Sequence, residues 1–154
     1  MKKKKRSPRK SKETGKKLID HANRAIRQEF YLEAALILSD VFEKRIRYLL
    51  ARSGQPKTAT GNSLEHAVKR LKYVHLTHQF PELNTHLPVV LIDAIRGWKN
   101  QRNNILKDLM DIHVSETRLK SLAVNGMTLL KEFNQSVKKV KSALKTEPEP
   151  NPSE

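Results

Sequence analysis

An arginine stands where an apolar side chain is expected. Between residues 91 and 109 apolar residues recur at helical spacing, and Arg102 falls on their stripe, between Trp98 and Ile105. An unpaired guanidinium is costly to bury, so Arg102 should be paired, or face a cleft or a subunit interface. Alternatively, its aliphatic stem packs while its charged head reaches water. Position alone leaves both interpretations open.

A polar and basic row runs beside Arg102 on the same predicted helix. Its members follow at steps of four, three and four residues: Arg96, Asn100, Asn103 and Lys107. Together with Arg102 they could hold a phosphate through charge-assisted hydrogen bonds, although such a row can also be a solvated helix face. Glu43, beside the apolar stripe of an earlier helix, could orient an arginine across the bundle or pair locally with Arg47.

The sequence supports metal binding, cysteine chemistry and base stacking less well. His75, His78 and His86 have poor spacing for zinc and no convincing further ligand, so we predict no metal and no cofactor. Cysteine is absent, which excludes disulfides, thiolate metal sites and a cysteine nucleophile. Aromatic residues make up only 5% of the chain and do not interleave with the basic row. Contacts to nucleic acid would therefore go to phosphates rather than to stacked bases.

The charge of the chain predicts a negatively charged partner. Of a net charge of +15, residues 1–17 contribute +9, residues 146–154 contribute −3, and residues 18–145 contribute the remaining +9. The central segment is thus basic in its own right, and such a field attracts polyanions. We expect RNA to be the partner.

Helical periodicity spans the chain between its two ends, with no strand pattern. We predict an all-α bundle of four or five helices over residues 16–145, a disordered basic arm over 1–15, and a disordered acidic, proline-rich tail over 146–154. Expected helix starts are Asn62 with Glu65, Thr85 with Pro88 in the first turn, and Ser115. No apolar run approaches the roughly 20 residues of a membrane span, and no secretory signal is recognisable, so a cytoplasmic protein is expected.

The final predicted helix has a near-heptad apolar stripe. It comprises Leu119, Leu122, Gly126, Leu129, Phe133, Val137, Val140 and Leu144. The stripe could be core, or it could be a surface for a protein partner.

The segment around Arg102 resembles the HEPN superfamily. It reads Ile95-Arg96-Gly97-Trp98-Lys99-Asn100-Gln101-Arg102-Asn103-Asn104-Ile105-Leu106-Lys107. Members are helical bundles, typically dimeric, and many are metal-independent endoribonucleases of toxin–antitoxin, CRISPR-associated or anti-phage systems. Their signature is an arginine, often followed by a polar residue, with a histidine after four to six further residues. The helix pattern is similar over roughly residues 16–140, including Ala22, Tyr31, Ala34, Ala35, Phe42-Glu43 and Ser63-Leu64.

The resemblance implies a homodimer in which Arg102, Asn103 and Lys107 bind RNA phosphate where two copies meet. Lys107 occupies the position of the family's histidine. An ordinary lysine is a poor base at neutral pH but a good phosphate ligand. The nuclease centre is therefore expected to be degenerate or altered. Active cleavage would need Arg102 with Lys107 or His113. A non-catalytic module, binding an antitoxin, a nucleotidyltransferase or another defence protein, is the alternative.

Overall fold

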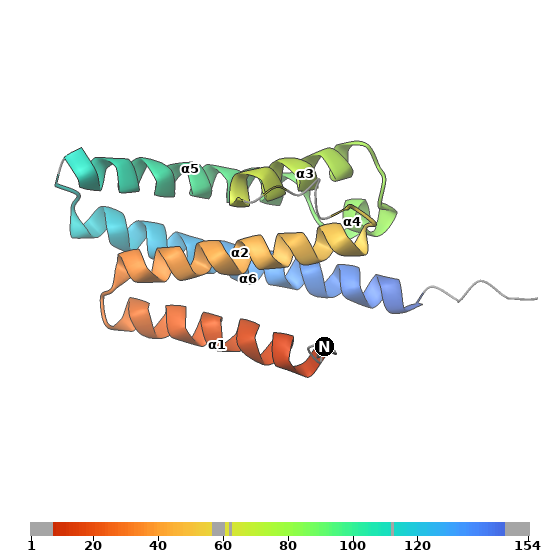
Figure 1. Cartoon of the computed structure of the whole chain (residues 1–154), viewed down its shortest axis with the longest axis horizontal. Coiled ribbons are helices and arrows are strands. Elements are labelled where there is room, and N and C mark those ends of the chain that lie inside the picture. The colour runs from red at the N-terminus through yellow and green to blue at the C-terminus, as the bar shows by residue number, and fades with distance from the viewer. Residues whose placement is uncertain (1–7, 57–60, 62, 112, 147–154) are drawn as a thin grey trace, which may run out of the picture.

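The computed structural model describes residues 8–56, 61, 63–111 and 113–146, and this part of the chain folds into six helices. Figure 1 shows their arrangement along one long axis. The helices are α1 (Pro8–Arg27), α2 (Tyr31–Arg52), α3 (Leu64–Leu76), α4 (Pro81–His86), α5 (Val89–Asp111) and α6 (Glu116–Thr146). The all-α prediction is thereby confirmed. None of the helices in these ranges is long and apolar enough to cross a membrane.

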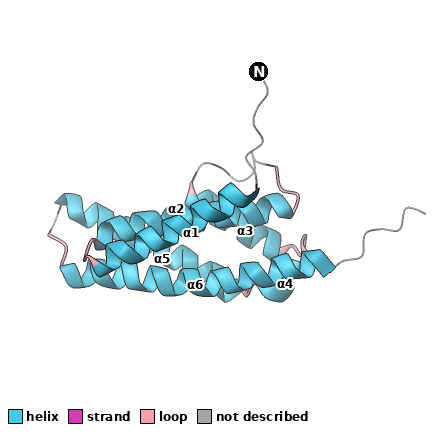
Figure 2. Ribbon diagram, turned by 90° about the horizontal axis from the view of Figure 1, so that it is seen from below, coloured by secondary structure: helices cyan, strands magenta, loops and turns pink. Residues whose placement is uncertain are grey.

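Four helices enclose the core. Around it, α2 packs against α3 and α6, and α5 packs against the same two helices. The first helix, α1, lies outside this group, mainly against α2, and the short α4 packs against α6 (Figures 1 and 2). Amphipathic helices that each bury one apolar stripe give this architecture.

Aromatic side chains join the helices at the centre. The Phe42 ring lies 5.4 Å from the Trp98 ring and 6.1 Å from the Phe133 ring, linking α2 to α5 and α6. The Trp98 Nε1 donates a buried hydrogen bond of 2.8 Å to the carbonyl of Leu122. Gly126 makes room for this indole, because a Cβ there would lie 2.7 Å from two of its ring carbons.

The apolar stripe of α6 is core. Four of its members, Leu122, Phe133, Val137 and Val140, are at most 2% exposed, and Leu119, Leu129 and Leu144 pack against the same cluster while partly exposed. This burial answers the question left by the sequence, because a stripe already covered by α2 and α5 is not available to a partner.

Several predicted boundaries are wrong. Residues 8–15 are helical rather than disordered, and α1 begins at Pro8, a residue well suited to a first helical turn. Thr146 belongs to α6 rather than to a tail. Residues 1–7 and 147–154 of the predicted arm and tail, and Asn62, lie outside the described residues.

The remaining corrections concern helix ends. The N-cap of α3 is Ser63, whose hydroxyl accepts a hydrogen bond from the His66 amide. Thr85 lies in the last turn of α4 and donates to the carbonyl of Pro81, so it starts no helix. Helix α4 was not among the predicted helices; it begins at Pro81, a residue type that is well suited to the first turn of a helix. The predicted cap at Ser115 is confirmed by its bond from the Arg118 amide.

Only the N-terminal part of α5 is covered by α3 (Figure 1). The start of α3 lies level with the middle of α5, where Glu65 meets Lys99. The later turns of α5, which hold Arg102 and Leu106, lie beyond the start of α3, because α3 runs back toward the start of α5, where Lys72 meets Asp93. Leu109, the last residue of the predicted apolar stripe, is 38% exposed, and the adjoining Met110 is 88% exposed.

Candidate nucleic-acid interface

Arg102 lies half-buried at the edge of the core. The neighbouring stripe residues Trp98 and Ile105 are 5% and 1% exposed, so the arginine does interrupt a buried row, as predicted. Its surroundings therefore combine an apolar floor with access to water. A guanidinium in such a place is partly stripped of hydration before any ligand arrives, which strengthens its attraction for an anion.

Asn103 holds the guanidinium group of Arg102. The Nε and Nη2 atoms both donate to the Asn103 Oδ1, at 3.2 Å and 2.8 Å. This contact fixes the plane of the fork and uses the acceptor of the amide. The amide of Asn103 is left with its two donors, so arginine and asparagine together present donors only, as an anion site requires.

Glu43 of α2 faces this arginine from across the bundle. Partial burial lowers the pKa of the Arg102 guanidinium, and the negative charge of Glu43 opposes that shift. The Arg102 guanidinium remains a cation at neutral pH. Glu43 also accepts a hydrogen bond of 2.9 Å from Arg47, so the predicted local pairing is confirmed, and orientation of Arg102 by Glu43 stays a prediction.

The rest of the predicted row forms a solvent-facing edge of α5. All of its members are exposed: Arg96, Asn100, Asn103 and Lys107. They lie on the outer side of the helix next to Arg102, as their spacing predicts. The structure thus places one half-buried cation beside a donor-rich outer edge.

His113 lies apart from this group. It is exposed and follows the end of α5 at Asp111, in the connection to α6. Nine residues of helix separate Arg102 from that end, or about 14 Å along the axis. The structure therefore keeps His113 away from Arg102 within one chain.

Sequence reasoning missed Lys99, the most deeply buried charged side chain of the candidate region. It lies on the same face of α5 as Arg102, one turn earlier, and its side chain is only 3% exposed. Its Nζ is 3.4 Å from the Glu65 Oε1, and Lys69 shares this carboxylate at 3.7 Å. Hydrogen bonding and charge from Lys99 lower the pKa of Glu65. Lys99 therefore fastens α3 to α5 and is not available to a ligand.

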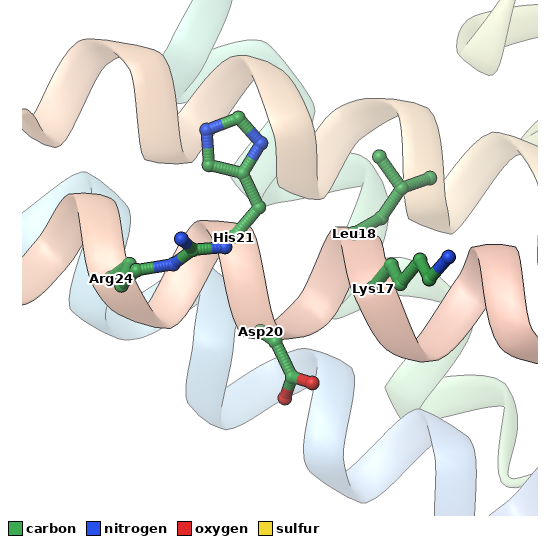
Figure 3. A pocket seen from close by; sticks show the side chains of 5 residues that line it. All are labelled: Lys17, Leu18, Asp20, His21 and Arg24. Carbon is green, nitrogen blue, oxygen red and sulfur yellow. The ribbon is translucent and has the colours of Figure 1, made fainter.

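No other part of the described surface gathers the same features. Two shallow hollows lie along α1, lined by residues that include Asp20 and Arg24 and by none of the predicted site residues. In Figure 3, Asp20 and His21 project from opposite sides of α1. His21 pairs with Glu33, at 3.3 Å. These side chains do not converge on a common point.

Metal ligands are not grouped in the described residues. No cluster of three or more histidine, aspartate or glutamate side chains that could hold an ion occurs there. The His75 ring instead donates from Nε2 to the carbonyl of Leu87, at 2.8 Å, in the connection after α4. This histidine therefore joins α3 to the start of α5.

Comparison with known proteins adds no relative. Neither the family models, nor the curated proteins, nor the solved structures contain a match to this chain. What the protein does must therefore be argued from Arg102, its partners and the charge around them.

Proposed function

We propose that this protein is an HEPN-like RNA-binding protein in which Arg102 is the principal phosphate ligand. The observation that supports this function best is a half-buried guanidinium whose fork is fixed by Asn103 and opens beside exposed donors. A preorganised fork matches two oxygens of one phosphate. The excess of positive charge on the central segment supports a polyanionic ligand.

Binding of a single-stranded RNA oligonucleotide tests the role of Arg102. Arg102→Ala should weaken binding at least about tenfold, because it removes a charge-assisted contact, and should reduce the salt dependence by about one phosphate. Arg102→Lys should recover only part of the loss, since a lysine keeps the charge without the fork. Asn103→Ala should give an intermediate loss.

Arg52→Ala is the matched control. Arg52 is exposed near the end of α2, so its replacement removes the same charge from another surface. Less than about twofold weakening is expected there, from long-range charge alone. Equal losses for the Arg102 and Arg52 variants would refute a dedicated phosphate site.

The proposal includes a homodimer in which the second copy covers the C-terminal part of α5, beyond the start of α3. Support comes from Leu109 and Met110, which are exposed on or beside the face that holds Arg102. A second copy would bury these apolar side chains and bring two Arg102 groups into one composite site. Sedimentation or light scattering should show a dimer that Met110→Glu dissociates, and a wild-type monomer at high protein concentration would contradict this part.

Within this proposal the protein belongs to a toxin–antitoxin or defence system, and its nuclease centre is degenerate or altered because Lys107 stands in place of histidine. Lys107 and His113 are the candidate partners of Arg102 in any cleavage. Incubation of RNA in the presence of a chelator tests activity. Cleavage lost in Arg102→Ala would establish a metal-independent endoribonuclease, whereas RNA that stays intact supports binding alone.

The second candidate is a non-catalytic module for a protein partner such as an antitoxin or a nucleotidyltransferase. The observation in its favour is the same pair of exposed apolar side chains, Leu109 and Met110. Met110→Glu would then abolish capture of the partner while leaving RNA affinity unchanged. That result would favour the second candidate over the first.

A further inference from the structure

Four lysines follow one line along α6. They are Lys120, Lys131, Lys138 and Lys145, and all four are exposed. Steps of eleven and seven residues each return to within about 20° of the same side of a helix. We call these four side chains the α6 lysine row.

The α6 lysine row is long and straight. It extends over about 37 Å at 1.5 Å per residue. The last three members are about 10 Å apart, and Lys120 is separated from them by Met127, which lies on the same line and is buried. Figure 1 shows that α6 spans the whole length of the bundle. Of the two carboxylates of the helix, Glu116 lies one turn before Lys120, at the start of the row, and Glu132 is about 100° around from Lys131.

These lysines have no intramolecular partner in the described part of the chain. The lysines of α2 and α3 are paired there, since Lys44 meets Asp40 at 2.9 Å and Lys72 meets Asp93 at 2.7 Å. Even Lys141, beside the row, lies over the Tyr48 ring. The row is thus a line of unneutralised charge, which attracts a polyanion.

The row borders α1 and α2 and is distinct from the Arg102 surface. Lys120 is three residues from Ala123, which packs with Ala25 and Tyr31. Lys138 and Lys145 flank Lys141, which faces Tyr48 of α2. The contacts of α6 with α5 lie further around the helix, where Trp98 meets Leu122 and Gly126.

The chemistry of the row selects among polyanions. The one aromatic residue of α6, Phe133, is fully buried, and the exposed Tyr48 of α2, beside the row, has Lys141 over its ring, so the row has no series of rings on which successive unpaired bases could stack. Insertion into a lipid surface needs a free apolar helix face, and the apolar face of α6 is core. Phosphates held at fixed positions along a rigid rod are the best match, since four lysines on one rigid helix can meet them without ordering a flexible strand.

We propose that the α6 lysine row binds the phosphodiester backbone of a nucleic-acid duplex. The contact is independent of base sequence, because lysines act on phosphates as point charges. This inference does not depend on Arg102, whose surface is separate.

The test measures the affinity of the full 154-residue chain for 20-base-pair RNA and DNA duplexes over a range of salt. Lys131→Gln/Lys138→Gln should weaken duplex binding about tenfold and lower the salt slope by about two phosphates. If affinity falls for both duplexes, the ligand is the phosphodiester backbone that they share. If it falls for only one, that duplex is the ligand. The control Lys44→Gln/Lys69→Gln removes equal charge from α2 and α3 and should change affinity less than about threefold. Circular dichroism confirms that both variants stay folded.

Three results would overturn the inference. The first is a Lys131/Lys138 variant that loses no more duplex affinity than the control. The second is an equal loss on a single strand of the same length. The third is an equal loss on phosphatidylserine vesicles, which would assign the row to anionic membranes instead. Arg102→Ala should leave duplex affinity within about twofold. The two proposals can fail separately. If Arg102→Ala weakens single-strand binding while the Lys131/Lys138 variant keeps full duplex affinity, this inference is refuted and the proposed function stands.

Discussion

Lys99 and Arg102 lie one turn apart on the same face of α5, and their environments differ. Lys99 is 2% exposed and reaches Glu65 of α3, at 3.4 Å. Arg102 is half-buried, and its guanidinium donates two hydrogen bonds to the adjoining Asn103. The first cation meets the first turn of α3, and the second lies one turn of α5 beyond that contact.

The difference shows how the end of one helix can decide the role of a charge. A buried cation whose partner lies on a neighbouring helix fixes the distance between the two, and it costs stability if that partner is lost. A cation one turn further on, with a fixed fork and access to water, is ready for a ligand. Three measurements of stability sharpen this contrast.

The largest change in stability is expected at the contact between α5 and α6. Gly126→Ala places a Cβ 2.7 Å from ring atoms of Trp98, whose indole is held by its bond to Leu122, so the free energy of unfolding should fall by up to about 3 kcal/mol. Gly97→Ala is the matched control. No atom outside its own stretch of helix lies within 4 Å of the added Cβ, and helix propensity predicts that the free energy of unfolding rises by about 0.5–1 kcal/mol. Urea denaturation measures both variants. Unchanged stability of Gly126→Ala would show that the packing of Trp98 against α6 adjusts without cost.

A smaller effect is expected when each cation is truncated. Lys99→Ala removes three buried methylene groups and should cost about 2 kcal/mol in urea denaturation. Lys99→Met keeps the stem and should cost much less, since buried ion pairs are often replaced by apolar side chains without loss. Arg102→Ala should change stability by less than about 1 kcal/mol. If the Arg102 variant proved the less stable, the contrast would be reversed.

The smallest effect concerns the pH dependence of the Glu65 contact. Because the folded state lowers the pKa of Glu65 below its ordinary value of 4.5, the ionised carboxylate stabilises the fold at neutral pH. This contribution is lost as pH falls below 4.5 and through the lower folded-state pKa. Wild type should therefore be more stable than Glu65→Gln at pH 7, and the gap should close toward pH 3. An unchanged gap would show that Lys99 does not depend on this charge, and Glu132→Gln controls for an exposed carboxylate.

The apolar periodicity predicted most of the fold. The stripe of α6 and the interruption at Arg102 follow from spacing of three and four residues, and the structure confirms both. The cap at Ser115 was also predictable from its residue type. These features depend on neighbours within one or two helical turns, which a sequence shows directly.

Features that depend on distant partners were not predictable in this way. The burial of Lys99 requires that the start of α3 lie beside the middle of α5, and no local pattern encodes that placement. The helical start of α1 was not predicted, because a highly basic run is typical of disordered segments. Lysine is nevertheless compatible with a helix. For the site, residue types indicated Arg102 and Asn103, and only the structure shows the fork held by the amide.

The indole of Trp98 gives the molecule a built-in optical reporter. It is the only tryptophan of the chain, and it lies within the contact between α5 and α6, one turn before Arg102. Its emission therefore comes from a single known environment and shifts when water reaches that contact. One fluorophore can thus follow both unfolding of the bundle and events at the neighbouring arginine, without any label.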